Sequence, residues 1–315
     1  MAMRITKPNK LKKGSLIGVI SPASPPDDLS TIDSGVNYLE KLGYRVEVGK
    51  NVAQNHGYLA GTDQQRLDDL HYMFKRKDVK AIFCIRGGYG TPRLLDKIDY
   101  SLIRKNPKIL VGYSDITALQ MAIIKRTGLV TFAGPMVSTD FHNNVSSFTE
   151  EMFWRMITSN KKIGSVKQPD DEKIFELHKG QAKGRILGGN LSVFTSLAGT
   201  QFMPDLKEKI LLLEEIGELP YRIDRLLNQL RLNKVFTQIK AVILGSFIDC
   251  NEHDPLKKTL SLGEVISQYL EDTKIPVAYN FKHGHIRDNI TVPFGIMVRL
   301  NTSKRTIEYT EGAVI

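Results

Sequence analysis

Cysteine is scarce in this chain: only Cys84 and Cys250 occur among its 315 residues. The two residues do not form a C-x-x-C pair, so the sequence signals neither a zinc knuckle nor a redox-active dithiol. Each cysteine follows a short apolar run, AIFC or SFIDC, of the kind found in β-strands. Because free cysteine is among the residue types most often buried, we expect two buried free thiols.

Long hydrophobic runs are also missing. The apolar run near the N-terminus, 16–20, has five residues, whereas a signal peptide needs an apolar region of about 7–15 residues. No segment approaches the ~20 apolar residues of a membrane-spanning helix. We therefore expect a soluble, cytoplasmic protein with no membrane partner.

Motifs for binding nucleic acids and nucleotides are absent as well. The formal net charge is +10, but the positive residues form only short clusters, such as KLKK at 10–13. No RNA-recognition, zinc-finger or basic-zipper pattern accompanies these clusters, and neither a G-x-G-x-x-G nor a Walker A sequence occurs. We predict a solvated basic surface, with no nucleic-acid partner and no dinucleotide cofactor.

The first half of the chain alternates apolar strand patterns with helix patterns. Strands are expected at 15–21, 44–48, 79–85, 108–113 and 129–134, and helices at 29–42, 63–75 and 116–126. Fully apolar strands that alternate with helices are typical of a parallel sheet covered on both faces. The carboxyl ends of such strands share one edge of the sheet, and ligands bind beyond that edge.

The pattern changes near residue 140, where a polar stretch, a helix at 148–157 and a charged connector at 159–173 follow one another. In the second half, strands are expected at 184–189, 209–215, 240–247, 276–281, 291–300 and 306–310, and helices near 190 and at 221–232 and 262–270. The last three strands have no helix between them. We predict a parallel-sheet α/β N-terminal domain at 1–160 and a strand-rich α+β C-terminal domain at 161–315.

The most informative local pattern is KILVGYSDITALQMAI at 108–123. Ser114 stands between an apolar strand and a helix, which is where a nucleophile elbow holds its serine. Gly112 permits a tight turn, and the N–H of Asp115 at the helix start can stabilise an oxyanion. The pattern departs from G-x-S-x-G, since Ile116 occupies the second glycine position. A serine or aspartate before a helix is also a common N-cap.

A glycine-rich loop, IRGGYG at 85–90, follows the strand at 79–85. Glycines let a reacting group approach the backbone closely. Both this loop and Ser114 follow strands that end at the same sheet edge. One N–H of the loop and that of Asp115 would complete an oxyanion hole, whereas the alternative is a plain tight turn.

Two further groups could take part in chemistry. Glu214 and Glu215 end an apolar strand and point to opposite faces, so one of them can enter a site while the other faces solvent. His283 and His285 follow the strand at 276–281, and a loop histidine can act as a general base near neutral pH. An H-x-H pair could instead bind zinc with Glu214 or His253, but no third ligand has a recognisable spacing.

Together these candidates supply a serine, a carboxylate and a histidine, which nucleophilic catalysis requires as a set. In these residues the chain resembles the LD-carboxypeptidase family, which includes muramoyltetrapeptide carboxypeptidases and microcin C immunity peptidases. The matching stretches, in the family's order, are GVISPAS (18–24), GYLAGTDQQRLDDL (57–70), IFCIRGGYG (82–90), LVGYSDITAL (110–119), GGNLS (188–192), LLLEEIGELPYRIDR (211–225) and GHIRDNITVPFG (284–295).

The resemblance implies a Ser-Glu-His triad made of Ser114, Glu214 and His285, with an oxyanion hole from the N–H groups of Gly88 and Asp115. Family members often have Glu-Asp where this chain has two glutamates, so Glu215 stays open as the alternative carboxylate. The family fold pairs an α/β domain with a strand-rich domain, with the site between them. The resemblance also implies a homodimer.

The activity implied by the resemblance is that of a serine carboxypeptidase without metal or cofactor. Its small peptide substrate would be a murein tetrapeptide, cut before the terminal D-alanine during peptidoglycan recycling. Two alternatives stay open: an immunity-type peptidase that cleaves aminoacyl-nucleotide antibiotics, and a non-catalytic binding protein for cell-wall peptides. An exopeptidase also needs a basic residue for the terminal carboxylate, and the sequence does not identify it.

Overall fold

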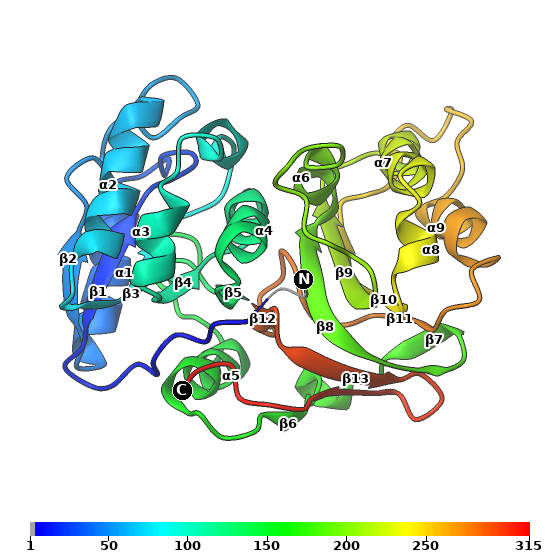
Figure 1. The fold of residues 1–315 in the computed structure, drawn as a ribbon. Helices are drawn as coiled ribbons and strands as arrows, with labels where there is room; N and C mark the ends of the chain where they lie inside the picture. The colour runs from blue at the N-terminus through cyan, green and yellow to red at the C-terminus, as the bar shows by residue number, and fades with distance from the viewer. Residues whose placement is uncertain (1–3) are drawn as a thin grey trace.

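The computed structural model of the chain describes residues 4–315, so the first three residues of the predicted N-terminal domain lie outside the described residues. The chain forms a mixed α/β fold with two sheets (Figure 1). The first sheet has the strand order β12-β5-β4-β3-β1-β2. Its parallel strands are β1 (Leu16–Ile20), β2 (Arg45–Val48), β3 (Val79–Cys84), β4 (Ile109–Val111) and β5 (Thr131–Ala133). The predicted parallel sheet of the first half is confirmed.

The helices of the first half are α1 (Ser30–Lys41), α2 (Asp63–Lys75), α3 (Tyr100–Lys105), α4 (Ile116–Thr127) and α5 (Ser147–Thr158), with a 3₁₀ turn η1 (Thr91–Leu94). Helix α4 is buried on nearly all sides. The reason is its position: α4 packs on β5 of the first sheet and also contacts β8 and α6 of the second half (Figure 1). A helix enclosed in this way needs apolar residues around its whole circumference.

The second sheet has the strand order β6-β14-β13-β8-β9-β10-β11-β7. Its strands are β6 (Gly164–Ser165), β7 (Phe175–His178), β8 (Gln181–Asn190), β9 (Lys209–Ile216), β10 (Ala241–Ile248), β11 (Val277–Tyr279), β13 (Met297–Asn301) and β14 (Thr306–Tyr309). The four central strands, β8 to β11, are parallel, and the strands outside them are antiparallel. The strand-rich character predicted for the second half is confirmed.

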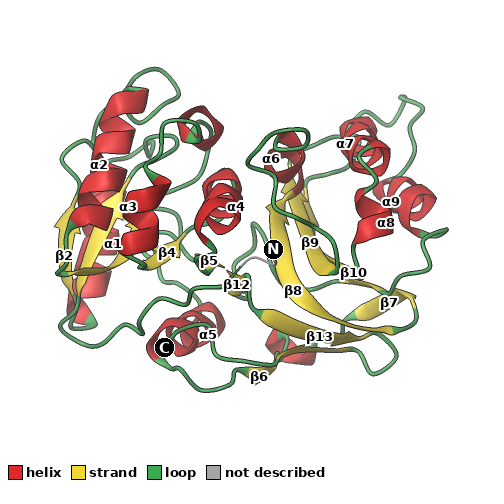
Figure 2. Cartoon of the chain, in the orientation of Figure 1, coloured by secondary structure: helices red, strands yellow, loops and turns green. Residues whose placement is uncertain are grey.

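The helices of the second half are α6 (Leu191–Ser196), α7 (Pro220–Leu232), α8 (Val235–Gln238) and α9 (Leu262–Leu270), with a 3₁₀ turn η2 (Pro169–Asp171). Helices α7, α8 and α9 lie on the side of the second sheet that faces away from the first sheet (Figure 2). The carboxyl end of β8 contacts α4, where the Asn190 N–H donates to the Thr117 hydroxyl, and β8 also contacts β12 of the first sheet.

The prediction of a single strand at 291–300 is wrong. The segment forms two strands in different sheets: β12 (Val292–Phe294) pairs antiparallel with β5, and β13 pairs with β8. The chain changes sheets at Gly295, which has φ 97° and whose N–H donates to the carbonyl of Ile186. A strand from the second half thereby completes the first sheet.

Both cysteines are buried free thiols, as predicted. Burial raises the pKa of Cys250 to about 11, which keeps its thiol protonated and inert near neutral pH. Among residues 4–315 there is no helix with the length and apolar character needed to cross a membrane.

Candidate active site

Ser114 lies on the turn between β4 and α4 in a left-handed backbone conformation, with φ 62°. Such a conformation is unfavourable for a residue with a side chain and persists only where surrounding structure enforces it. Gly112 is part of the structure that enforces this conformation. A Cβ atom at position 112 would lie 2.9 Å from Cγ1 of Ile116 and 3.2 Å from Cβ of Cys84. The turn is therefore tight, and the Ser114 side chain is held out at the carboxyl edge of the sheet.

The glycine loop after β3 contacts this serine directly. A Cβ atom at Gly87 would lie 2.9 Å from Oγ of Ser114. Gly88 has φ 109° and packs against Ser24. Within the described residues, the N–H groups of Gly88 and Asp115 donate no hydrogen bond to another protein group. These two donors are thus available to a ligand beside Ser114.

Asp115 connects the turn that carries Ser114 to Thr91, the residue that follows the glycine loop at 85–90. Its Oδ2 accepts a hydrogen bond of 2.8 Å from the Thr91 N–H, and its carbonyl accepts one of 2.5 Å from the Thr91 hydroxyl. Burial raises the pKa of Asp115 to about 6. The carboxyl group is used within the fold, so only the backbone N–H of Asp115 faces the candidate site.

His285 and Glu214 form a hydrogen-bonded pair near the carboxyl end of β9 in the second sheet. Nδ1 of His285 lies 2.8 Å from Oε2 of Glu214, and the Glu214 side chain is fully buried. Burial of His285 disfavours its charged form, but the hydrogen bond to Glu214 and the charges of nearby carboxylates outweigh that effect and raise its pKa above the usual value. Because Nδ1 is occupied, Nε2 is the nitrogen left for a substrate or a nucleophile.

Glu214 and Glu215 make contacts with different groups, but the expectation that the second glutamate faces solvent is wrong, because Glu215 is buried. Its carboxylate accepts hydrogen bonds from the Asn190 amide (2.7 Å), from the Ser192 N–H and hydroxyl (2.8 and 2.6 Å), and from the N–H of Ile216 (2.9 Å). Glu215 therefore fixes the junction of β8 and α6. The glutamate that contacts the histidine is Glu214.

The environment of His283 is that of a residue that supports the fold. It is buried, its Nδ1 lies 2.7 Å from the Ile290 carbonyl oxygen, and burial lowers its pKa to about 4. Among residues 4–315, no three His, Cys, Asp or Glu side chains come together as a group that could hold a metal ion. The donor set that a zinc site at His283 and His285 would need is not assembled in that part of the chain.

Tyr113, the residue before the nucleophile candidate, contacts the histidine. The Tyr113 ring makes an edge-to-face contact with the His285 ring, with the centroids 5.2 Å apart. Within the described residues no hydrogen bond joins Ser114 to His285. Such bonds are often loose without substrate and tighten when substrate binds.

Sequence reasoning missed Asp140, which lies after β5 in a stretch interpreted only as polar. Its Oδ2 accepts a hydrogen bond of 2.8 Å from the Met136 N–H, and its Oδ1 accepts one of 3.4 Å from the Tyr113 hydroxyl. Burial raises its pKa to about 6, and its charge contributes to the raised pKa of His285. It lies six residues beyond the predicted strand at 129–134, and no local pattern in the sequence marks it as a site residue.

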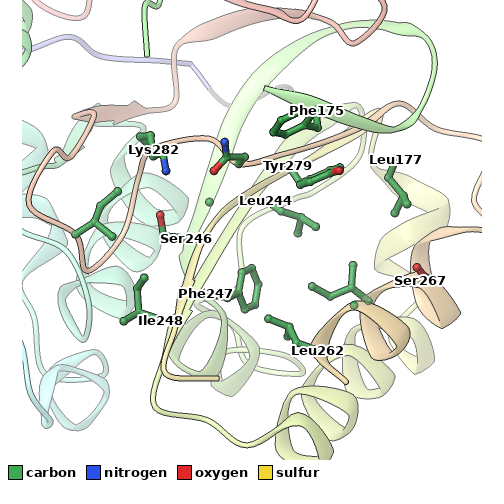
Figure 3. A pocket seen from close by; sticks show the side chains of 15 residues that line it. Phe175, Leu177, Leu244, Ser246, Phe247, Ile248, Leu262, Ser267, Tyr279 and Lys282 are labelled. Carbon is green, nitrogen blue, oxygen red and sulfur yellow. The ribbon is translucent and has the colours of Figure 1, made fainter. Parts of the chain in front are cut away.

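Two cavities flank the His285 loop, and Ile286 lines both. One, of about 640 Å³, is lined by Tyr113, Asp140, His285 and Arg287 among others. The other, of about 720 Å³, lies between α9 and strands β7, β10 and β11 (Figure 3). The second cavity has mainly apolar walls, with Ser246 and Lys282 near one end. Only the first cavity includes a candidate catalytic side chain.

Comparison with known proteins places this geometry in a family context. Two family models match the chain: the LD-carboxypeptidase N-terminal domain over residues 17–134 and the LD-carboxypeptidase C-terminal domain over residues 183–300. A relative from Bacillus subtilis (strain 168), named "Probable murein peptide carboxypeptidase", is 43% identical over 303 residues, which is 95% of this chain and 93% of the relative.

Two solved structures are similar over nearly the whole chain. The microcin C7 self-immunity protein MccF, in an inactive mutant apo state, has a TM-score of 0.89 at 28% identity, with 98% of this chain and 99% of that chain covered. The muramoyltetrapeptide carboxypeptidase from Oxalobacter formigenes has a TM-score of 0.81 at 30% identity, with 93% and 97% covered.

Proposed function

This chain belongs to the LD-carboxypeptidase family, and from this premise we propose that it hydrolyses the bond that joins the terminal D-alanine of a murein tetrapeptide to the L-centre of the third residue. It is a serine-type carboxypeptidase. The proposed catalytic residues are Ser114, Glu214 and His285, with the N–H groups of Gly88 and Asp115 as the oxyanion hole.

The first step of the proposed reaction is acylation of Ser114. Nε2 of His285 takes the hydroxyl proton of Ser114 as Oγ attacks the peptide carbonyl. Glu214 keeps the imidazole in the tautomer with a proton on Nδ1 and stabilises the imidazolium that forms. The N–H groups of Gly88 and Asp115 stabilise the oxyanion, at about 3 kcal/mol per donor.

The second step releases the products. The imidazolium of His285 donates its proton to the leaving nitrogen, so D-alanine departs and an ester with Ser114 remains. His285 then takes a proton from water, which attacks the ester, and Ser114 recovers its proton when the acyl group leaves. The bonds and protons balance without a metal or cofactor.

The observation that carries this proposal is the 2.8 Å hydrogen bond between His285 and a fully buried Glu214. A buried carboxylate that accepts from Nδ1 leaves Nε2 as the proton acceptor, which is the arrangement that a serine nucleophile requires. The strained φ of Ser114 and the two unused N–H groups beside it supply the remaining elements of acyl transfer.

The test is the Ser114→Ala variant. We expect release of D-alanine from the tetrapeptide to fall by at least about 10⁴-fold, since removal of a triad nucleophile has effects of that size. The denaturation curve should stay at the wild-type position. Ser101→Ala, an exposed serine on α3, is the matched control. Normal turnover by Ser114→Ala would refute the assignment.

A second candidate function is that of an immunity-type peptidase, and the similarity to the microcin C7 self-immunity protein favours it. The same acyl transfer applies, with an aminoacyl-nucleotide conjugate as substrate. Turnover of a tetrapeptide and of a peptidyl-adenylate analogue, measured side by side, separates the two. A non-catalytic binding protein would turn over neither and would leave Ser114 unlabelled by a fluorophosphonate.

The proposal extends to the assembly and location of the chain. It has two domains, at 1–160 and 161–315, and forms a homodimer in the cytoplasm, where tetrapeptides from the cell wall are recycled. Light scattering coupled to size-exclusion chromatography tests the dimer, because a mass close to one chain at micromolar concentration contradicts it. Cell fractionation tests the location.

A further inference from the structure

We propose that the cavity beside His285 receives the leaving residue of the substrate and that the Arg287 guanidinium binds its terminal carboxylate. This inference rests on the proposed function and adds the residue that makes the enzyme an exopeptidase. A peptide extended past that residue would have no free carboxylate at this point and would lose the interaction.

The direction of proton transfer determines on which side of Ser114 the leaving residue lies. His285 must donate its proton to the leaving nitrogen, so that nitrogen comes within hydrogen-bond reach of Nε2. In an amino acid, the carboxylate is attached to the same Cα as this nitrogen. The carboxylate is therefore held close to the imidazole, on the side opposite to the oxyanion donors of Gly88 and Asp115.

The cavity of about 640 Å³ beside the imidazole is lined by both His285 and Arg287, and by Tyr113, the neighbour of Ser114 in the chain. Arg287 is the only arginine or lysine among the lining residues. The other polar groups include Asn143, Asn144 and Ser146. Because Arg287 and the proposed base line the same cavity, this arginine is the candidate partner for a carboxylate that is attached to the same Cα as the leaving nitrogen.

The Arg287 side chain is available to bind a ligand, whereas its backbone is held by a hydrogen bond. It is exposed, and it forms no ion pair within residues 4–315. Its carbonyl accepts a hydrogen bond of 2.8 Å from the Thr149 hydroxyl. Arg86, in the glycine loop, instead contacts Asp27 (3.4 Å) and the Pro25 carbonyl (3.2 Å). Arg287 is thus the better placed of the two arginines.

One carboxylate, that of Asp140, also lines the cavity and would repel a bound anion. Two features reduce that repulsion. Its oxygens accept hydrogen bonds from the Met136 N–H and the Tyr113 hydroxyl. Burial also raises its pKa to about 6, which lessens the negative charge that it carries in mildly acidic solution. Arg287 remains the arginine in the lining that can pair with an anion.

The experiment compares two substrates, a tetrapeptide with a free terminal carboxylate and the same tetrapeptide with a C-terminal amide. We expect the wild-type enzyme to prefer the free acid. In Arg287→Gln, KM for the free acid should rise by roughly 10- to 100-fold, with a much smaller change for the amide. Arg287→Lys keeps the charge and should recover part of the preference. Arg225→Gln, an exposed arginine on α7, is the matched control.

The inference is overturned when Arg287→Gln discriminates between acid and amide as well as the wild type does. If the wild type releases neither D-alanine from the free acid nor D-alaninamide from the amide, the proposed function fails instead, so the two failures are distinct. Fluorophosphonate labelling of Ser114 in each variant reports whether the nucleophile is intact, and Arg287→Lys keeps the comparison informative if Arg287→Gln does not fold. A preference for the peptidyl-adenylate analogue that depends on Arg287 would also contradict carboxylate recognition.

Discussion

His285 illustrates how single residues acquire their chemistry from their neighbours in this fold. Its ring is held by the Glu214 carboxylate on one side and by the Tyr113 ring on another. Burial alone would lower its pKa, yet the carboxylates of Glu214, Glu215 and Asp140 raise it. A raised pKa makes the neutral form a stronger base, but it also makes that form scarcer at low pH.

The first prediction follows from this balance. The base must be neutral to accept the Ser114 proton, so kcat/KM should fall as the pH drops through the pKa of His285, which lies above about 6.5. In Glu214→Gln the pKa should decrease, because a negative charge is removed, and the acidic limb should move to lower pH. The maximal rate should also fall by as much as ~10⁴-fold.

The pH profile of kcat/KM is measured for the wild type, for Glu214→Gln and for Glu151→Gln, an exposed glutamate on α5 that serves as the control. The control should have the wild-type profile. An acidic limb at the same pH in Glu214→Gln would mean that another group titrates there, and His285 would lose its proposed role as the base.

The helices were predicted best from the sequence where local signals mark their ends. Helix α2 occupies the predicted residues 63–75 and α9 the predicted residues 262–270. Both begin with a capping box, Thr62 with Gln65 and Ser261 with Glu264. A capping box satisfies two backbone N–H groups by contacts within four residues, so its effect does not depend on the rest of the fold.

The strands at the chain's second half were harder to predict because their partners are distant. The run TVPFGIMVRL is apolar throughout, and no local signal says that Val292–Phe294 joins the first sheet while Met297–Asn301 joins the second. The change of sheet at Gly295 follows from tertiary pairing. The candidate site residues could be predicted because each follows a strand, whereas Asp140 and Arg287 have no pattern of their own.

Two glycines, Gly188 within β8 and Gly295 between β12 and β13, give the second prediction, at the scale of the elements. Gly188 in β8 has φ 133°, and a Cβ atom there would lie 1.8 Å from the Leu212 carbonyl oxygen. Gly295 has φ 97°, but a Cβ atom there has no contact closer than 3.6 Å. Gly295→Ala should thus cost about 1–3 kcal/mol of backbone strain. Gly188→Ala should cost more than ~4 kcal/mol, because backbone must move as well.

Urea denaturation of the two variants measures the free energy of unfolding, and each serves as the other's control. Failure of Gly188→Ala to fold, with Gly295→Ala folded, agrees with the expected order. Equal losses in the two variants would mean that β8 can shift away from β9 at little cost, contrary to the close pairing of these strands.

At the scale of the whole molecule, the proposed triad comes from both halves of the chain, so activity depends on how the halves are fixed. Ser114 follows β4 of the first sheet, whereas Glu214 and His285 belong to the second half. Helix α4 packs against β8 and α6, and the Asn190 N–H donates to the Thr117 hydroxyl at 3.2 Å. The sequence predicts that the proposed triad is divided between the two halves, because Ser114 lies before residue 160 and the other two residues lie after it. The contacts that fix the halves could not be predicted.

Thr149 on α5 connects the first half to the loop that carries His285, and it gives the third prediction. Its buried hydroxyl donates to the Arg287 carbonyl and accepts from the Asn289 N–H, both at 2.8 Å. Asn289 in turn bonds to the backbone of Gly284, next to His285. In Thr149→Val the buried Asn289 N–H loses its partner, which should cost about 1–3 kcal/mol of stability.

Thr149→Ser keeps the hydroxyl and is the control that separates position from stability. If Thr149 fixes the His285 loop, Thr149→Val should lower kcat/KM for the tetrapeptide by about 10-fold even far below its unfolding transition, since small displacements of catalytic groups have large kinetic effects. Thr149→Ser should stay within about 2-fold of the wild type, because both hydrogen bonds can form. A Thr149→Val variant that is less stable but has wild-type kinetics would show that Thr149 does not position the His285 loop for catalysis.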